Sequence, residues 1–205
     1  MYRLFGKRLF DLILSLIGVL VCLPMFVIVA ILIKLDSPGP IFFIQKRMGK
    51  NGGLFSLFKF RTMFVDAAAG ILMFEPGSKN RVTRVGKLLR LTKIDEFPQL
   101  LNVLMGDMSF VGPRPEVPKY KEFYSGENSI VLTIRPGITD MASVKYRHEE
   151  EMLAQSKGPE KFYTEVILPD KLKINKDYIQ KGIGLVNDFK IILSTLLEIK
   201  CAKKN

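Results

Sequence analysis

The amino-acid sequence predicts an α+β fold, a mostly helical globular domain with a small β-hairpin, anchored by an N-terminal membrane helix and amphipathic surface helices. Three observations lead to this prediction. Residues 12–33 are uncharged and mostly apolar, two β-prone runs flank a glycine-rich turn, and helical spacing of apolar residues recurs through the rest of the chain. A length of 205 residues suits one domain with a core better than two. We therefore divide the chain into a membrane segment, residues 1–36, and one globular unit, residues 37–205.

The membrane segment contains a run of 22 uncharged residues, Leu12 to Ile33, long enough as a helix to cross about 30 Å of hydrocarbon. Pro24 divides this run into legs of 12 and 9 residues, each too short to cross alone. Lysines and arginines flank both ends, so both ends favour the cytoplasmic side. The sequence predicts a re-entrant helix-break-helix that enters one leaflet and returns, with Pro24 at its deepest point. A kinked spanning helix is the alternative.

The β-hairpin is predicted from two runs, Ile41–Lys46 and Leu54–Phe60, joined by glycines and an asparagine at 49–53. Residues 66–82 contain alanines, glycines and a proline, which is typical of a loop or short helix. Residues 110–140 contain four prolines and are expected to be ordered loop with little regular structure.

Helical spacing predicts two helices, Val85–Leu91 and Ile94–Met105, with Thr92 as the N-cap of the second. Residues 160–182 are expected to be helical in part and broken at Pro169. The last helix, Leu185–Ile199, is strongly amphipathic. Its apolar face is predicted to pack in the core, or alternatively to lie on the membrane surface, and comprises Phe189, Ile192, Leu193, Leu196 and Leu197.

The charge is uneven along the chain. The net charge is +11, and residues 1–93 carry 15 Lys and Arg against 4 Asp and Glu, whereas residues 94–205 carry 16 of each. A basic half indicates an anionic partner: nucleic acid, acidic phospholipid or a phosphate-bearing substrate. Cys22 and Cys201 lack metal-ligand spacing, which disfavours a zinc site or a disulfide framework. His148, the single histidine, lies in a charged run and is expected at the surface.

Candidate chemistry centres on Asp95 and Glu96, in the first turn of the predicted helix 94–105. Acidic residues there also simply complement the helix dipole. Arg114 and Arg135 each precede a proline, which confines their backbone to extended geometry and stiffens a guanidinium for phosphate binding. A carboxylate kept ionised by a helix N-terminus and cations can attack phosphorus. A divalent ion could bridge it to a diphosphate, and Glu96 would be a candidate for proton transfer.

The residues around this pair resemble a known family. The run LTKIDEFPQLLNVL at 91–104, followed by GDMSFVGPRP at 106–115, resembles the central signature of the bacterial sugar transferases, the small monotopic phosphoglycosyl transferases. Further matches are Lys7-Arg8 ahead of the proline-containing helix, Gln45-x-Arg47-x-Gly49, residues 59–63 and residues 135–139. The resemblance covers essentially the whole chain and corresponds to the catalytic module alone.

The resemblance implies an enzyme that moves a sugar 1-phosphate from a nucleotide sugar, usually a UDP-sugar, to polyprenyl phosphate. UMP is released, and the polyprenyl-diphosphate-sugar enters glycoconjugate or polysaccharide biosynthesis. Asp95 would be the nucleophile, forming a covalent phosphosugar intermediate and binding Mg²⁺, with Glu96 as its catalytic partner. The substrate- and phosphate-binding residues expected from the resemblance and the backbone argument are Lys59, Arg61, Arg90, Arg114, Arg135, Arg147 and Asp188.

The resemblance also implies a place in the cell. A monotopic protein on the cytoplasmic face of the bacterial inner membrane would contact anionic phospholipid, and the re-entrant interpretation of residues 9–33 gains support. The amphipathic C-terminal helix could serve a homodimer. The chain departs from the family pattern at Leu23, where serine commonly precedes the proline, and over residues 140–149, although Arg147 keeps its spacing.

Two other classes of protein are alternatives. A membrane-tethered nucleic-acid binder would explain the basic half, but the chain has no binding motif and no aromatic-basic interleaving, so we expect no nucleic-acid partner. A catalytically inactive membrane scaffold of the same fold is the second, and the intact Asp95-Glu96 pair argues against it. The sequence leaves open the sugar, the base, the oligomeric state and the pathway.

Overall fold

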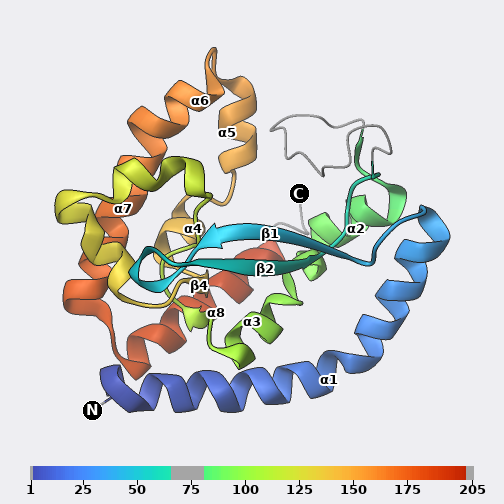
Figure 1. Ribbon diagram of the computed structural model, residues 1–205, viewed down its shortest axis with the longest axis horizontal. Helices are drawn as coiled ribbons and strands as arrows, with labels where there is room; N and C mark the ends of the chain where they lie inside the picture. The colour runs from blue at the N-terminus through green and yellow to red at the C-terminus, as the bar shows by residue number, and fades with distance from the viewer. Residues whose placement is uncertain (1, 66–80, 202–205) are drawn as a thin grey trace.

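A computed structural model describes residues 2–65 and 81–201, so most of the predicted loop at 66–82 lies outside the described residues. Figure 1 shows a mostly helical molecule with a long N-terminal helix and a small central hairpin, which confirms the prediction of a mostly helical domain with a small β-hairpin. The α-helices are α1 (Lys7–Asp36), α2 (Arg84–Thr92), α3 (Gln99–Met105), α4 (Met141–Lys145), α5 (Glu149–Gln155), α6 (Pro159–Phe162), α7 (Leu168–Asp177) and α8 (Leu185–Cys201). The strands are β1 (Phe42–Met48), β2 (Leu54–Phe60), β3 (Ser109–Val111) and β4 (Gly137–Thr139).

Helix α1 has 30 residues and includes Pro24 without an interruption of helical structure. Its ribbon passes beneath the rest of the molecule and bends upward toward its C-terminal end (Figure 1). Only 11% of its most apolar stretch is buried, and it is the one helix in the described ranges long and apolar enough to cross a membrane. The described domain therefore covers little of the apolar surface of α1, although Val29 and Ile33 pack against Phe60 and Leu89.

The predicted hairpin is present. Strands β1 and β2 pair antiparallel, from Phe42 opposite Phe60 to Met48 opposite Leu54. The connecting turn includes a residue with positive φ, Asn51 at 58°, a conformation that asparagine tolerates better than most residues. Buried side chains of β2, including Phe55 and Leu57, pack against Val103 of α3 and against Met108, which lies just after that helix. The hairpin thus lies against the helix that follows Asp95 and Glu96.

The chain between α2 and α3 differs from the prediction at Thr92. Thr83 caps the N-terminus of α2 by accepting a hydrogen bond from the backbone N–H of Gly86, but Thr92 is the last residue of α2 and not an N-cap. Its hydroxyl donates back to the carbonyl of Leu88. The turn is made instead by Lys93, whose left-handed backbone closes α2 and opens a 3₁₀ turn, Ile94–Glu96.

The proline-rich region 110–140 contains more regular structure than expected. Strands β3 and β4 pair in parallel, and two 3₁₀ helices, Pro118–Tyr124 and Gly126–Thr133, connect them. A Cβ at Gly137 would collide with the backbone of Gly112, so this close strand approach requires glycine. Local sequence could not show the strand pairing, because the two strands are far apart along the chain.

The C-terminal region is a helical run that Pro169 does not break. Pro169 lies in the first turn of α7, where a missing N–H costs little, and a π-helical turn, Tyr163–Ile167, precedes it. The main hydrophobic core lies here and includes Tyr163, Ile167 and Leu172.

Helix α8 does not bury the face that its spacing suggested. Ile191 is fully buried and Ile192 packs against the core, but the other predicted core residues are 46–60% exposed: Phe189, Leu193, Leu196 and Leu197. The face turned to the domain instead carries Asp188 and Thr195. Asp188 accepts a hydrogen bond from Tyr178, just after α7, and Thr195 bonds to Thr139 in β4. The core-packing prediction is therefore wrong for these four side chains.

Candidate active site

Glu96 is the centre of an ion-pair cluster built from three segments. Lys59, near the end of β2, donates from Nζ to Glu96 Oε1 at 2.8 Å. Arg114, in the loop after β3, donates from its two terminal nitrogens to Oε1 at 2.6 Å and to Oε2 at 3.4 Å. The structure therefore brings together three of the predicted site residues, Lys59, Glu96 and Arg114.

These contacts determine the charge of Glu96. Burial alone would raise the pKa of this carboxyl, but the positive charges and hydrogen bonds of Arg114 and Lys59 outweigh burial and hold its pKa well below the ordinary value. Glu96 is thus ionised at neutral pH and carries no proton to donate. Both of its oxygens already accept hydrogen bonds, which does not favour the proton-transfer role expected from the sequence.

The pKa of Asp95 is shifted in the opposite direction to that of Glu96. Its side chain is buried, and burial together with the negative charge of Glu96 raises its pKa to about 6. Lys59, Lys93 and Arg90 act in the other direction. From the sequence we expected nearby cations to dominate the pKa of Asp95, but desolvation is the larger effect. Asp95 Oδ1 is buried with no hydrogen-bond partner in the described part of the chain, which leaves one acceptor oxygen for a ligand.

The donor set around Asp95 fits Mg²⁺ in the way that nucleotide-binding enzymes use it. Mg²⁺ prefers oxygen ligands and is commonly held by one or two carboxylates together with substrate phosphates and water. The unpartnered Oδ1 of Asp95 provides one such oxygen, whereas the oxygens of Glu96 are occupied by Lys59 and Arg114. Residues 2–65 and 81–201 contain no cluster of three or more His, Cys, Asp or Glu that could form a metal cage.

Arg90, another predicted site residue, precedes Asp95 by five residues in the chain. It is in the last turn of α2, and its Nε donates a hydrogen bond to Thr62 Oγ1 at 3.0 Å. This bond restrains the position of the guanidinium group. Its positive charge lowers the pKa of Asp95. Arg90 can thus supply positive charge to an anion that approaches Asp95.

The position of Arg114 is supported by residues that the sequence argument did not assign to the site. Asp140 Oδ2 accepts the backbone N–H of Arg114 at 2.8 Å, and the same carboxylate caps α4. Arg47 donates to the carbonyl of Pro115 at 3.1 Å and to Gln45 Oε1. The Gln45-x-Arg47 spacing indicated that these two side chains lie on one face of a strand, because alternate residues of a strand share a face. No local sequence pattern linked Asp140 to Arg114.

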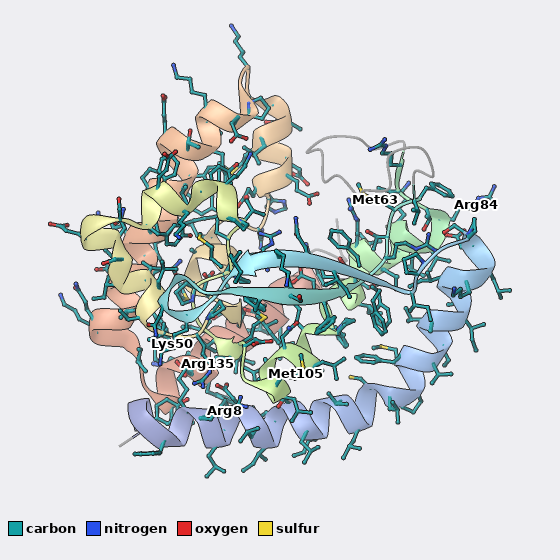
Figure 2. All side chains as sticks on the ribbon, viewed as in Figure 1. Arg8, Lys50, Met63, Arg84, Met105 and Arg135 are labelled. Atoms are coloured by element: carbon teal, nitrogen blue, oxygen red, sulfur yellow. The ribbon has the colours of Figure 1, made fainter. Side chains whose placement is uncertain are left out.

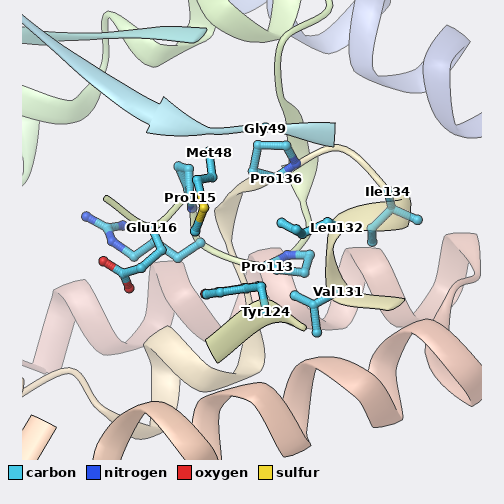
Figure 3. Close-up of a pocket in the computed structure, with 11 residues that line it drawn as sticks. Met48, Gly49, Pro113, Pro115, Glu116, Tyr124, Val131, Leu132, Ile134 and Pro136 are labelled. Atoms are coloured by element: carbon cyan, nitrogen blue, oxygen red, sulfur yellow. The ribbon is translucent and has the colours of Figure 1, made fainter. Parts of the chain in front are cut away.

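A mostly apolar pocket, whose lining includes Arg114 and its neighbours Pro113 and Pro115, lies beside this cluster (Figure 3). Its lining includes Met48, Pro113, Tyr124, Val131, Leu132 and Pro136. Asp95 and Glu96 are not part of this lining. The pocket therefore belongs to the support of the Arg114 loop, and the acidic pair lies outside it.

Two predicted phosphate-binding arginines lie in other clusters. Arg61 is buried and donates to the carbonyls of Ser37 and Pro38, where α1 ends. Arg135 lies near Arg8, below the hairpin in Figure 2, and donates to the carbonyl of Gly106 just past the C-terminus of α3. That is the end of α3 opposite Asp95.

Asp188 is fully buried and receives three donors: Tyr2 Oη at 2.8 Å, Tyr178 Oη at 2.6 Å and Lys7 Nζ. It joins the start of α1 to the C-terminal helices. Arg147 is exposed in the turn between α4 and α5. The structure thus gives Asp188 an anchoring contact away from the acidic pair.

Comparison with known proteins identifies the family. The family model described as bacterial sugar transferase matches residues 2–201. A UDP-glucose:undecaprenyl-phosphate glucose-1-phosphate transferase of Caulobacter vibrioides is 37% identical over 193 residues, covering 93% of this chain and 68% of that protein. The exopolysaccharide production protein PSS of Rhizobium leguminosarum is 36% identical over 208 residues, covering 93% of both.

A third relative is longer than the chain. A UDP-N-acetylgalactosamine-undecaprenyl-phosphate N-acetylgalactosaminephosphotransferase of Aeromonas hydrophila is 41% identical over 143 residues, which are 68% of this chain and 34% of that protein. The shared region thus includes a module that occurs within larger transferases. The chain belongs to the bacterial sugar transferase family and is a phosphoglycosyl transferase.

Proposed function

We propose that the protein transfers a sugar 1-phosphate from a UDP-sugar to polyprenyl phosphate, through a covalent phosphosugar intermediate on Asp95, and releases UMP. The relatives named above support the substrate classes. The observation that supports the intermediate is the contrast within the acidic pair. Glu96 is engaged by two cations, while Asp95 has a buried carboxylate oxygen without a partner.

The reaction proceeds in two displacements at one phosphorus atom. In the first, a carboxylate oxygen of Asp95 attacks the phosphorus that bears the sugar, and the bond from this phosphorus to the UMP oxygen breaks, so UMP leaves with the bonding electron pair. In the second, an oxygen of polyprenyl phosphate attacks the same phosphorus and displaces the Asp95 carboxylate. Neither displacement needs a proton from Glu96, in agreement with its lowered pKa. Mg²⁺, when bound, supplies charge neutralisation between the carboxylate and the diphosphate.

The basic side chains of the site have two different roles. Lys59 and Arg114 neutralise Glu96 and hold the turn that carries Asp95, so that Asp95 is presented from a rigid support. Arg90, whose positive charge acts on Asp95, stabilises the negative charge that develops on the transferring phosphoryl group. The side chain of Arg147 is exposed, and its role in substrate binding stays a prediction.

The membrane arrangement proposed for α1 is re-entrant, with the globular domain on the cytoplasmic face of the bacterial inner membrane. Support comes from the two ends of α1. Lys7 pairs with Asp188, and at the other end Asp36 accepts the backbone N–H of Val85, so both ends contact the same domain. A spanning helix would separate its ends by the thickness of the bilayer.

Helix α8 would add a second membrane contact. Its exposed apolar row, together with the exposed Lys190, is suited to the interface of a membrane that contains anionic phospholipid. The exposed row comprises Leu185, Val186, Phe189, Leu193, Leu196 and Leu197.

The decisive experiment places the protein in nanodiscs with polyprenyl phosphate, Mg²⁺ and a panel of UDP-sugars and measures UMP release. Omitting the lipid substrate should trap a hexose-phosphate-sized adduct on the peptide that contains Asp95, and Asp95→Asn should lose both the adduct and turnover. Near-normal turnover of Asp95→Asn would reject the covalent mechanism. Inactivity of the wild-type protein with the whole panel would favour the inactive scaffold.

A further inference from the structure

Lys93 adopts a backbone conformation that lysine rarely adopts. Its φ is 57° and its ψ is 15°, and Asn51 is the other non-glycine residue with positive φ in the described ranges 2–65 and 81–201. Glycine or asparagine makes such a helix-ending turn with less strain. Non-glycine residues in this region of backbone space persist where the surrounding structure holds them, and they cluster at functional sites.

The turn at Lys93 places the acidic pair. The N–H of Lys93 donates to the carbonyl of Arg90 at 3.2 Å and closes α2, and its carbonyl accepts the N–H of Glu96 at 3.3 Å. Asp95 therefore follows Lys93 by two residues on a hydrogen-bonded turn. A glycine could provide this geometry, so the backbone does not account for the lysine side chain.

The second observation concerns the charge of the Lys93 side chain. Lys59 and Arg114 pair with Glu96, whereas Lys93 and Arg90 form no ion pair with a carboxylate in the part of the chain that the structure describes. Lys93 is exposed, and its charge acts on Asp95 in the same direction as that of Arg90. Two cations that pair with no carboxylate in the described ranges thus act on the carboxylate that has a free acceptor oxygen.

We propose that Lys93 is a substrate-binding residue whose ammonium group contacts the diphosphate of the nucleotide sugar on the solvent-facing side of Asp95. This inference rests on the proposed function and adds a residue to its substrate site. A flexible ammonium group is suited to a diphosphate, because it can follow the charge as the leaving nucleoside monophosphate separates. Polyprenyl phosphate offers the same chemistry, so the test compares the two substrates.

The test uses substitutions that keep the turn. Asparagine tolerates positive φ, so Lys93→Asn removes the charge while the backbone geometry is retained, and Lys93→Arg keeps the charge. Lys87→Gln, an exposed position in α2, is the matched control for loss of one positive charge. Thermal unfolding in detergent should show Lys93→Asn to be as stable as the wild type.

Two readouts separate the outcomes. Equilibrium binding of Mg²⁺-UDP, measured without lipid substrate, should weaken about tenfold in Lys93→Asn and not in Lys93→Arg or Lys87→Gln. In turnover, KM for the UDP-sugar should rise by a similar factor while KM for polyprenyl phosphate stays constant.

Unchanged Mg²⁺-UDP binding in Lys93→Asn would overturn the inference, and so would a change confined to the KM for polyprenyl phosphate. The binding measurement does not depend on the covalent mechanism, since it can be repeated with Asp95→Asn. Failure of Lys93 and failure of the proposed intermediate are therefore distinguishable.

Discussion

Arg114 holds Glu96 in a two-point contact, with one guanidinium nitrogen 2.6 Å from Oε1 and the other 3.4 Å from Oε2. The backbone N–H of the same arginine is fixed by Asp140. The carboxylate of Glu96 is thereby occupied by ion pairs, and Asp95 is the member of the acidic pair with an oxygen available to a ligand. This division of roles between adjacent carboxylates leads to the following predictions.

Arg114→Lys should lower UMP release about 10- to 100-fold, because a lysine keeps the charge but cannot make two parallel hydrogen bonds to one carboxylate. The loss should be mainly in kcat, since Glu96 would no longer hold the turn before α3 rigidly. Arg84→Lys, the same change at an exposed position of α2, is the control and should have wild-type activity. A fully active Arg114→Lys would show that a single cationic contact suffices.

Asp95→Asn should stabilise the folded protein while it abolishes turnover. Because the pKa of Asp95 is raised from 3.8 to about 6, its ionised form disfavours the folded state at neutral pH, by up to about 3 kcal/mol. The variant should therefore have a higher Tm in detergent at pH 7. The gain should shrink as the pH falls below about 6 and vanish below 3.8, where Asp95 is protonated in both states. A lower Tm at pH 7 would contradict this account.

The pH profile of kcat/KM should rise through pH 6, because the nucleophile must be ionised and its pKa is about 6. Glu96 should add no inflection near neutrality, since its pKa lies well below the ordinary value. His148→Gln, which removes the single histidine of the chain, is the control. If this variant loses the inflection, the profile reports His148 and not Asp95.

Asp188→Asn should destabilise the protein by about 3 kcal/mol, because it leaves the ammonium of Lys7 without its buried partner. Tyr2→Phe, which removes one hydrogen bond to the same carboxylate, should cost only about 1 kcal/mol. Tm in detergent reports both changes. Unaltered stability with lost UDP-sugar binding would instead place Asp188 in the substrate site.

Pro24 should determine the membrane topology. Phe5 is exposed near the N-terminus, so a Phe5→Cys variant in a Cys22→Ser and Cys201→Ser background can be labelled with an impermeant thiol reagent. The reagent should reach it from the cytoplasmic side, and Pro24→Ala should let some molecules label from the periplasm, because the full run is long enough to span. Periplasmic labelling with Pro24 present would reject the re-entrant arrangement.

Local features of the fold were predictable from the sequence because short-range interactions determine them. The hairpin follows from alternating β-prone residues around a turn with glycine and asparagine, and α2 follows from helical spacing that begins at a threonine cap. The turn at Lys93 was not predicted, although it too is a short-range feature. This left-handed turn replaced the expected cap at Thr92, since a threonine hydroxyl can instead bond back to its own helix.

The sequence by itself determined the family, the acidic pair and the apolar helix, since each is encoded in a continuous run of residues. Tertiary structure alone decided which cations reach that pair. Lys59 and Arg114 converge on Glu96, while Arg61 and Arg135 cap helix ends, because each guanidinium bonds to whatever acceptors the fold brings near it. The exposed face of α8 was decided in the same way, by the burial of Asp188 against Lys7 from the other end of the chain.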